Sequence, residues 1–412
     1  MKTLFKTKKQ ILVLTPIYPA DDIPKGWTPV VHYFACEWVK QGYEVHVINF
    51  VANFPRPLYW ISSLFKNRLS SKAGYTIRTT TLKDKEYELD GVHVCRIMLS
   101  KVRPHVRYSS KQIHMAISKT LDYCTQNQIE PMTILAHWAN PQLEIIYRLK
   151  QHINVPMCYI CHGDGHFEVY GDDAERYWSA VDVIGYRSAY LKQCFETEQK
   201  WIKPSFMCYS GIPASYNDNT VARDFKTRNR VVYVGTLIKR KYPSEIIPAL
   251  CQAFGCDFAM EYAGEGVERK VIEQVCKELD VTKNVHLLGR IPRDKVIELL
   301  DNSDLFIMIS RSEIYGLVYL EAMARGCITI ASRREGFDGI IKDGENGFLC
   351  EAGSSEELTN ILKRIKAMSQ KELLQISERA MQTARLLTDE LAAKNYIDSV
   401  IGCYTCKQTI LT

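Results

Sequence analysis

The chain has 412 residues, of which 46% are hydrophobic and 24% are charged. Wholesale disorder and collagen-like structure are therefore excluded, and two or three domains are expected. The 53 basic and 47 acidic residues give a formal net charge of +6, which does not predict a nucleic-acid partner and fits an anionic small ligand or an anionic membrane surface. We find no apolar run long enough to span a membrane and no signal peptide after the basic residues 1–10, so we expect a cytoplasmic protein.

The first half of the chain alternates apolar, strand-like segments with helical ones. Strands are expected at residues 10–15, 44–50, 132–136, 157–161 and 181–185. A helix is expected between the first two strands, at residues 30–41, closed by Gly42. Such strand–helix–strand units predict a parallel sheet with helices on its faces.

The second half repeats this pattern after a polar segment, residues 213–229, which is expected to be a linker. Strands are expected at residues 230–235, 258–263, 285–288, 305–310 and 328–331. Helices are expected at residues 267–279, 294–302, 317–325, 355–368 and 386–403. Two α/β runs predict two Rossmann-like domains, residues 1–212 and 230–385, that face a central cleft.

Residues 310–326 carry the strongest sign of a ligand site, because their loop follows a predicted strand and ligands of open α/β sheets bind at strand carboxyl ends. Gly316 allows close approach to the backbone, and the unpaired amides of a helix beginning at Leu317 suit a phosphate. Glu313 and Glu321 flank this helix start, where each can accept hydrogen bonds from a hydroxyl on one side of a diphosphate. For Glu321, the alternative is an ordinary glutamate on an exposed helix.

The Glu313-x7-Glu321 spacing resembles the signature of the family-4 retaining glycosyltransferases of the GT-B fold. Segments resembling their donor domain follow in the right order at residues 234–241, 262–266, 284–294 and 345–349. The resemblance covers nearly all of residues 230–365. It implies the GT-B fold, with a C-terminal helix, residues 386–412, that packs back on the first domain.

The resemblance also implies a nucleotide-sugar donor, UDP- or GDP-linked, and assigns residues to it. Glu313 would contact the donor sugar, Glu321 the ribose and Lys241 the leaving phosphate. The further donor-binding positions are Gly26, Thr236, Arg240, Gly264, Arg290, Ile291, Tyr315, Gly316, Leu317 and Val318, with the amides of Gly316 and Leu317 at the diphosphate and the backbone of Arg290 and Ile291 at the base.

Two positions depart from the family pattern. Thr236 stands where the family often has a second phosphate-binding arginine, and Tyr242 stands where glycine often follows the lysine. Either Lys239 or Arg240 would supply the missing charge. The alternative for this basic cluster is a solvated turn.

Two histidine-bearing segments, residues 136–141 and 160–165, resemble the family's strand ends in the first domain. By this resemblance, His162 faces the reacting sugar and helps to align its own peptide carbonyl toward the anomeric carbon. The alternative for His162 is a structural histidine at a strand end. For His137, the two interpretations stay open.

We expect no metal ion. The His162–His166 segment lacks a second ligand cluster, and the pairs Cys158/Cys161 and Cys403/Cys406 do not form a convincing zinc site. The sequence has no Asp-x-Asp motif, the usual cation-binding signature of the other large glycosyltransferase fold. Lys241, its basic neighbours and the helix start would then balance the diphosphate.

Residues 56–72 place apolar side chains at helical spacing among four positive charges. This pattern predicts either an amphipathic helix on an anionic membrane, near a lipid-linked acceptor, or an ordinary helix with a basic solvated face.

The predicted function is a metal-independent, retaining, hexosyltransferase-type glycosyltransferase that uses a glycan or lipid-linked acceptor in polysaccharide or glycoconjugate biosynthesis. It would work in the cytoplasm, peripherally on the inner face of the cell membrane, without a nucleic-acid partner. The alternatives are a sugar-nucleotide epimerase of the same fold and a non-catalytic sugar-nucleotide-binding subunit.

Overall fold

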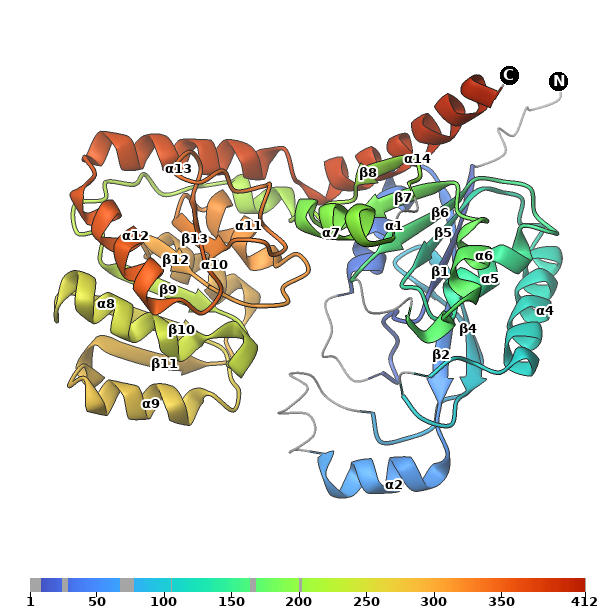
Figure 1. Cartoon of the computed structure of the whole chain (residues 1–412), viewed down its shortest axis with the longest axis horizontal. Helices are drawn as coiled ribbons and strands as arrows, with labels where there is room; N and C mark the ends of the chain where they lie inside the picture. The colour runs from blue at the N-terminus through green and yellow to red at the C-terminus, as the bar shows by residue number, and fades with distance from the viewer. Residues whose placement is uncertain are drawn as a thin grey trace.

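The computed structural model describes residues 9–23, 29–66, 78–104, 106–163, 168–199 and 202–411. It has two lobes, each built on a sheet covered by helices (Figure 1). The first sheet has eight strands in the order β3-β4-β2-β1-β5-β6-β7-β8. Its strands are β1 (Gln10–Thr15), β2 (Glu44–Asn53), β3 (Lys85–Leu89), β4 (Val92–Ser100), β5 (Pro131–His137), β6 (Met157–Cys161), β7 (Val183–Tyr186) and β8 (Ser205–Met207). β3 pairs with β4 in antiparallel fashion, and the other neighbours pair in parallel.

The first sheet is buried on both faces because helices cover each side. Its helices are α1 (Val30–Lys40), α2 (Arg56–Leu64), α4 (Ser110–Gln126), α5 (Gln142–Leu149), α6 (Asp173–Trp178), α7 (Ala189–Gln199) and α14 (Asp389–Leu411). Successive strand side chains point to opposite faces. Accordingly, Ile11 and Val13 pack with α1 and α14, whereas Leu12 and Leu14 pack with α4 and α5. The continuous apolar run of β1 is typical of such a doubly covered parallel strand.

The second sheet has six parallel strands in the order β11-β10-β9-β12-β13-β14. The strands are β9 (Arg230–Val234), β10 (Ala259–Ala263), β11 (Val285–Gly289), β12 (Leu305–Ile307), β13 (Ile328–Ser332) and β14 (Phe348–Cys350). The helices are α8 (Ile246–Phe254), α9 (Arg269–Glu278), α10 (Arg293–Asp301), α11 (Leu317–Ala324), α12 (Ser355–Ala367) and α13 (Gln370–Arg385).

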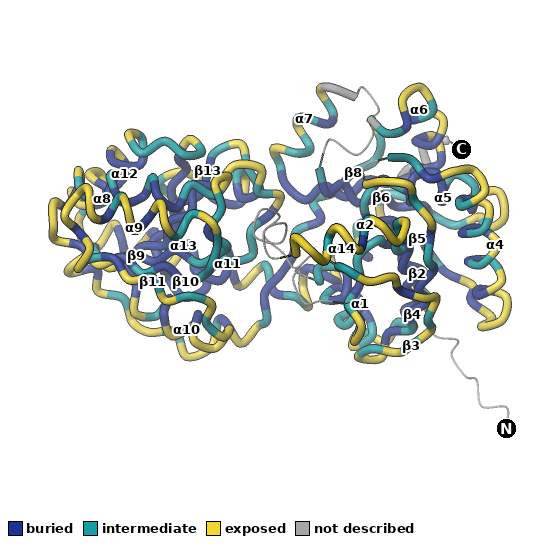
Figure 2. The backbone as a smooth tube through the Cα atoms, turned by 90° about the horizontal axis from the view of Figure 1, so that it is seen from below, coloured by how far each residue is buried: buried dark blue, intermediate teal, exposed yellow. Residues whose placement is uncertain are grey.

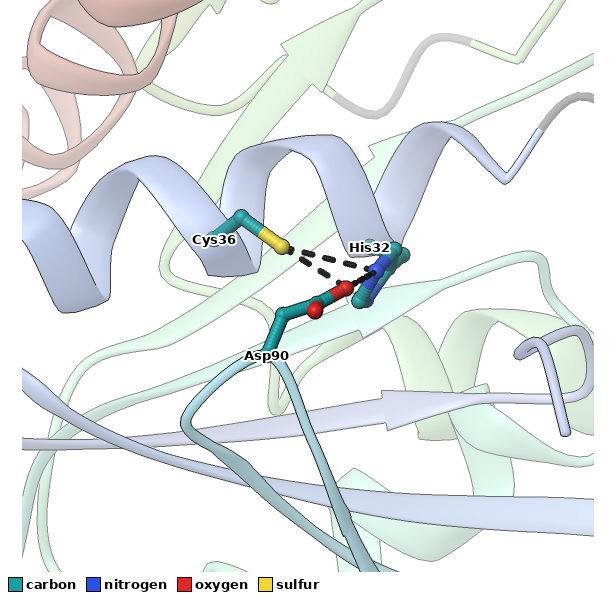
Figure 3. A group of neighbouring side chains, drawn as sticks. All are labelled: His32, Cys36 and Asp90. Atoms are coloured by element: carbon teal, nitrogen blue, oxygen red, sulfur yellow. Dashed lines mark hydrogen bonds and ion pairs between the residues drawn. The ribbon is translucent and has the colours of Figure 1, made fainter.

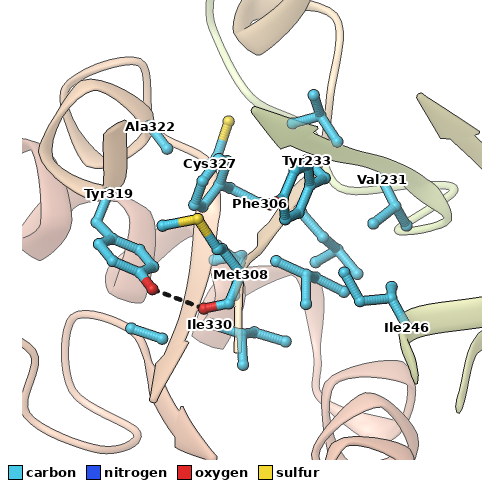
Figure 4. Close-up of a cluster of buried hydrophobic side chains, with 14 of the residues drawn as sticks. Val231, Tyr233, Ile246, Phe306, Met308, Tyr319, Ala322, Cys327 and Ile330 are labelled. Carbon is cyan, nitrogen blue, oxygen red and sulfur yellow. Dashed lines mark hydrogen bonds between the residues drawn. The ribbon is translucent and has the colours of Figure 1, made fainter. Parts of the chain in front are cut away.

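The core of the second lobe fixes the start of α11 against the sheet. Tyr233, Phe306 and Tyr319 belong to one buried cluster, part of which is drawn in Figure 4. The Tyr319 hydroxyl donates a hydrogen bond of 2.7 Å to the carbonyl oxygen of Met308. This bond ties the first turn of α11 to the backbone that follows β12, so the loop between them has two fixed ends.

Two chain segments cross between the lobes and pair with each other. The amide of Ile212 donates to the Leu387 carbonyl (3.1 Å), and the amide of Asp389 donates to the Ile212 carbonyl (2.9 Å). Gly211 is required here, since a Cβ at this position would lie 2.2 Å from the carbonyl carbon of Thr388. After this crossing, α14 lies along α1 of the first lobe (Figure 1).

The two predicted α/β domains form the two lobes, and most predicted strands and helices form within a few residues of their expected bounds. The predicted strand 305–310 is shorter, because the pairing of β12 with its neighbours stops at Ile307. The polar segment 213–229 is packed on the second lobe, where Tyr216 and Phe225 are buried. There Arg223 donates hydrogen bonds to backbone carbonyls of that lobe.

Buried residues follow the strands, while exposed residues follow the outer helix faces and α2 (Figure 2). Among the described residues, no helix is both long enough and apolar enough to cross a bilayer. Of the predicted amphipathic segment 56–72, α2 covers Arg56–Leu64, and residues 67–72 lie outside the described part.

Candidate functional site

A cavity of about 540 Å³ lies between the lobes, at the carboxyl ends of their strands. Side chains from both lobes line it: Val30, Tyr33, His162 and Arg187 come from the first. The predicted site residues that line it are His162, Thr236, Lys241, Glu313, Tyr315, Gly316, Leu317, Val318 and Glu321. Arg240, Gly264, Arg290 and Ile291 are not among the lining residues. Gly26 lies outside the described residues.

The start of α11 presents backbone to this cavity. Gly316 immediately precedes the helix with φ 83° and ψ 72°, a left-handed conformation that favours glycine, and no side chain caps the helix there. A Cβ on Gly316 would lie 2.5 Å from the ring of Tyr319. The amides of a helix start carry partial positive charge, so this end of the cavity suits an anion.

Lys241 and Glu313 form an ion pair at the centre of the site. The lysine Nζ lies 3.1 Å from Oε2 of Glu313, and the two side chains are only 13% and 15% exposed. Nη1 of Arg240 lies 3.6 Å from the same oxygen and is far more exposed to solvent. Lys241 thus brings a shielded positive charge to the cavity, while Arg240 supports the carboxylate from outside.

The loop that carries Glu313 is held by Glu335, a residue that the sequence did not single out. Its carboxylate accepts hydrogen bonds from the amides of Ser312 (3.0 Å) and Glu313 (2.7 Å), and burial raises the pKa of Glu335. The amide of Gly336 in turn donates to the Glu313 carbonyl (2.7 Å). The Glu313 side chain therefore projects from a loop whose backbone is fixed by hydrogen bonds.

Glu321 is 9% exposed, so it is not the exposed helix glutamate of the alternative interpretation. Its Oε1 accepts a hydrogen bond of 2.8 Å from Nη2 of Arg293, at the start of α10. Nε of Arg293 donates to the Tyr216 hydroxyl at 3.0 Å. Burial raises the pKa of Glu321, and the guanidinium opposes that rise. Arg293, which also lines the cavity, was not predicted as a site residue.

Gly264 has a packing role in the structure. A Cβ at this position would lie 1.9 Å from the carbonyl oxygen of Gly235. The amide of Gly235 donates to the Ala263 carbonyl at 2.9 Å, and that of Gly264 donates to the Gly289 carbonyl at 2.8 Å. The turns after β9 and β10 therefore approach backbone to backbone, which places Gly235 and Thr236 in the cavity wall.

His162 enters the cavity from the end of β6 and is buried. Its Nε2 lies 2.9 Å from Nδ1 of His137, which ends β5. The indole of Trp138 stacks on the His162 ring, with centroids 3.9 Å apart and planes 9° from parallel. Burial lowers the pKa of His137 to about 3, so this imidazole is neutral at physiological pH.

Arg187 joins the two lobes at the cavity. It donates hydrogen bonds to the Cys208 carbonyl (2.8 Å) and the Ser210 hydroxyl (2.7 Å). Its guanidinium lies 4.9 Å from the ring centroid of Tyr315, whose hydroxyl donates to the Ser210 carbonyl at 2.5 Å. Sequence reasoning missed Arg187, although it follows β7 directly, at the edge where ligands of parallel sheets bind.

A second cavity of about 570 Å³ meets the first at His162, Glu313 and Ile314. It is lined by residues of both lobes, including Tyr190 of α7 and Arg311. The Glu313 loop therefore stands between two neighbouring cavities.

Among the described residues, one group could share a metal ion: His32, Cys36 and Asp90, which lie near one another on α1 and the β3–β4 turn (Figure 3). Nε2 of His32 lies 3.0 Å from Oδ2 of Asp90, and its Nδ1 lies 2.9 Å from the Tyr18 hydroxyl. Burial raises the pKa of the Cys36 thiol to about 11. Hydrogen bonding within the protein accounts for both imidazole nitrogens, and no member of the group lines the cavity between the lobes.

Comparison with known proteins finds similarity that is concentrated in the second lobe. Residues 218–383 match the family model described as glycosyl transferases group 1. The match is confined to the second lobe and the segment that leads into it. A 126-residue segment is 34% identical to N-acetyl-alpha-D-glucosaminyl L-malate synthase of Bacillus anthracis, covering 30% of this chain and 32% of that protein. A 232-residue segment is 27% identical to an uncharacterized glycosyltransferase of Methanocaldococcus jannaschii, covering 55% of this chain and 62% of that protein.

The chain thus spans less than two thirds of the length of these two curated relatives. Similarity in structure extends over both lobes of this chain. The structure of Anabaena HepE in complex with UDP superposes with a TM-score of 0.65 and 17% identity, covering 95% of this chain and 99% of that one. This likeness shows the shared GT-B fold.

Proposed function

We propose that this protein is a retaining glycosyltransferase that transfers a sugar from a nucleoside diphosphate to a hydroxyl group of a glycan or lipid-linked acceptor. One observation carries the proposal. The uncapped start of α11, the shielded Lys241–Glu313 pair and the buried Glu321 line the same cavity between the lobes. The match of residues 218–383 to the model of glycosyl transferases group 1 supports it.

The donor diphosphate binds at the amides of Gly316 and Leu317 and beside Lys241, because these groups supply positive charge at a largely shielded position. Glu313 accepts hydrogen bonds from the donor sugar and Glu321 from the ribose. The Arg293 guanidinium favours the ionised form of Glu321 against the effect of burial, and the ionised carboxylate is a hydrogen-bond acceptor. The diphosphate charge is balanced by Lys241 and the helix start without a divalent ion.

The reaction follows from these positions. The bond between the anomeric carbon and the diphosphate oxygen breaks, and the positive charge that develops on the sugar is stabilised by carboxylate and carbonyl dipoles. The acceptor hydroxyl attacks from the face that the diphosphate leaves, and its proton passes to the departing phosphate oxygen. Closure of the lobes excludes water, so transfer prevails over hydrolysis.

The donor is proposed to be UDP- or GDP-linked. The Anabaena structure that shares this fold was determined with UDP, which favours UDP as the first nucleotide to test. The first cavity takes the nucleotide and the second receives the acceptor. The Glu313 loop separates them, so the two substrates meet beside His162.

We further propose that α2 contacts an anionic membrane surface that carries the acceptor. Its outer face leaves Trp60 67% exposed, together with Ile61, Leu64 and Phe65. The exposed Arg56 and Lys66 flank this apolar face, and such a combination is typical of helices that lie in the headgroup region. Placed there, the protein works on the inner face of the cell membrane.

Vesicle sedimentation tests this contact. The full chain is expected to co-sediment with vesicles containing phosphatidylglycerol, less with pure phosphatidylcholine, and less again after Trp60→Glu. Val102→Glu, at another exposed apolar residue, is the control. Equal sedimentation of the wild type and Trp60→Glu would contradict the proposal.

The transfer reaction is tested by incubating the protein with UDP-, GDP- and ADP-sugars and simple acceptors in the presence of EDTA. The expected products are a nucleoside diphosphate and a glycoside with the donor's anomeric configuration, read by NMR. An inverted product would contradict the retaining mechanism. Conversion of the donor alone into a new nucleotide sugar would indicate an epimerase, and binding without turnover of any donor would favour a non-catalytic subunit.

A further inference from the structure

Three buried side chains from separate elements form a continuous hydrogen-bonded chain that ends at the site. The hydroxyl of Tyr396, on α14, lies 3.2 Å from Nε2 of His137, at the end of β5. Nδ1 of His137 lies 2.9 Å from Nε2 of His162. All three residues are buried, and only His162 lines the cavities. The proposed reaction assigns no role to Tyr396 or His137.

Packing fixes the rings at both ends of this chain. The Tyr396 ring makes edge contacts with Phe34 and Trp38 of α1, with centroids 5.2 Å away in each case. At the other end, Trp138 stacks on His162. Because neither ring can turn without disturbing the core, the hydrogen-bond geometry is imposed by the fold.

The hydrogen positions in this hydrogen-bonded chain follow from the donors and acceptors that each side chain can offer. A neutral His137 has one N–H, so it donates to one neighbour and accepts from the other. If His137 donated to Tyr396, the tyrosine hydroxyl would need another acceptor. Within the described residues, His137 is its one hydrogen-bond partner, so that arrangement would bury an unpaired donor.

The favoured arrangement therefore runs from Tyr396 toward the site. The Tyr396 hydroxyl donates to Nε2 of His137, and the Nδ1 hydrogen of His137 is donated to Nε2 of His162. A neutral His162 then carries its own hydrogen on Nδ1. The buried, neutral state of His137 agrees with this direction.

We infer that Tyr396 is a positioning residue which, through His137, fixes the tautomer and orientation of His162 beside the reacting sugar. The inference rests on the proposed function for the role of His162 and on the hydrogen-bond chain for its geometry. The C-terminal helix α14 would then contribute to the reaction, because its Tyr396 is the first donor of the hydrogen-bonded chain that ends at His162 in the cavity.

The test uses Tyr396→Phe, which removes the hydroxyl and keeps the ring that packs on α1. The matched control is Tyr404→Phe, on the same helix and packed against the same core cluster. In the full chain with ¹⁵N-labelled histidine, NMR of the wild type is expected to show His162 with its hydrogen on Nδ1. Tyr396→Phe is expected to give a mixture of tautomers, while Tyr404→Phe keeps the wild-type spectrum.

Kinetics provide the second readout. Loss of one buried hydrogen bond is expected to lower kcat about tenfold in Tyr396→Phe, with little change in the donor KM. His137→Asn, which keeps an N–H near the position of Nδ1, is expected to retain more activity than His137→Leu. Melting temperatures check that each variant is folded.

A wild-type spectrum with the His162 hydrogen on Nε2 would overturn the inference, as would a Tyr396→Phe variant with unchanged tautomer and kcat. These outcomes are separable from failure of the proposed function. If no sugar donor is turned over by the wild type, the NMR measurement still decides whether Tyr396 sets the tautomer.

Discussion

Replacing Lys241 with methionine removes one positive charge from the cavity and keeps an unbranched side chain of similar length. In the wild type, Nζ lies 3.1 Å from Glu313, and neither side chain is more than 15% exposed. Solvent therefore screens the Lys241 charge poorly, and its attraction to the leaving diphosphate is strong. In the variant, Glu313 keeps only the more distant Arg240 (3.6 Å) among its ion-pair partners in the described structure, so its charge also opposes the diphosphate.

We expect this change to lower kcat by about 10²–10³-fold, equivalent to about 3–4 kcal/mol of transition-state stabilisation. The assay is release of nucleoside diphosphate with the donor and acceptor that support turnover. The control is Lys239→Met, which removes an exposed charge two residues away and is expected to retain nearly full activity.

The proposed role of Lys241 would be contradicted if Lys241→Met kept more than half of the wild-type kcat, or if Lys239→Met lost as much activity as Lys241→Met. The second result would mean that net charge near the loop, rather than the position of Lys241, supports the reaction. Melting temperatures of both variants show whether any loss reflects unfolding.

Three further changes test other parts of the structure. Gly316→Ala places a Cβ 2.5 Å from the Tyr319 ring at φ 83°, so we expect about 1–3 kcal/mol less stability in urea and weaker nucleotide binding. Gly211→Ala places a Cβ 2.2 Å from the Thr388 backbone and is expected to cost about 1–3 kcal/mol; unchanged urea midpoints would contradict either expectation. Burial, and after it the charge of Glu37, raises the pKa of Asp389 to about 6. The folded protein therefore favours the protonated carboxyl group. The resulting contribution to the free energy of unfolding is present at low pH and is lost as the pH rises through 6. Asp389→Asn should therefore be more stable than the wild type by about 1–2 kcal/mol above pH 7, with the difference gone near about pH 4; a difference independent of pH would refute this.

Local patterns in the sequence predict the α/β framework and the centre of the site. The apolar runs of β1 and β9 and the placement of Gly316 before a helix follow from residues adjacent in the chain. Glu321 stands out because a carboxylate within an apolar helix needs a partner. The sequence does not reveal that this partner is Arg293, because the two residues are 28 positions apart and lie on different helices.

One element outside the predicted set, helix α13, does carry a local sequence pattern. Ser369 and Glu372 form a capping box at the start of α13, a pattern typical of a helix start, although no helix is predicted there. By contrast, the link from Tyr396 to His162 spans 259 residues at its first step, and it exists only because α14 returns to the first lobe. Tertiary packing of this kind leaves no local pattern to find.

Calorimetric titration of the full chain with UDP, GDP and ADP in EDTA shows whether the cavity at the start of α11 holds a nucleoside diphosphate. We predict saturable binding of at least one of them at a single site per chain, weakened in Lys241→Met and preserved in Lys239→Met. The absence of binding by all three nucleotides, or equal affinity in the wild type and Lys241→Met, would contradict it.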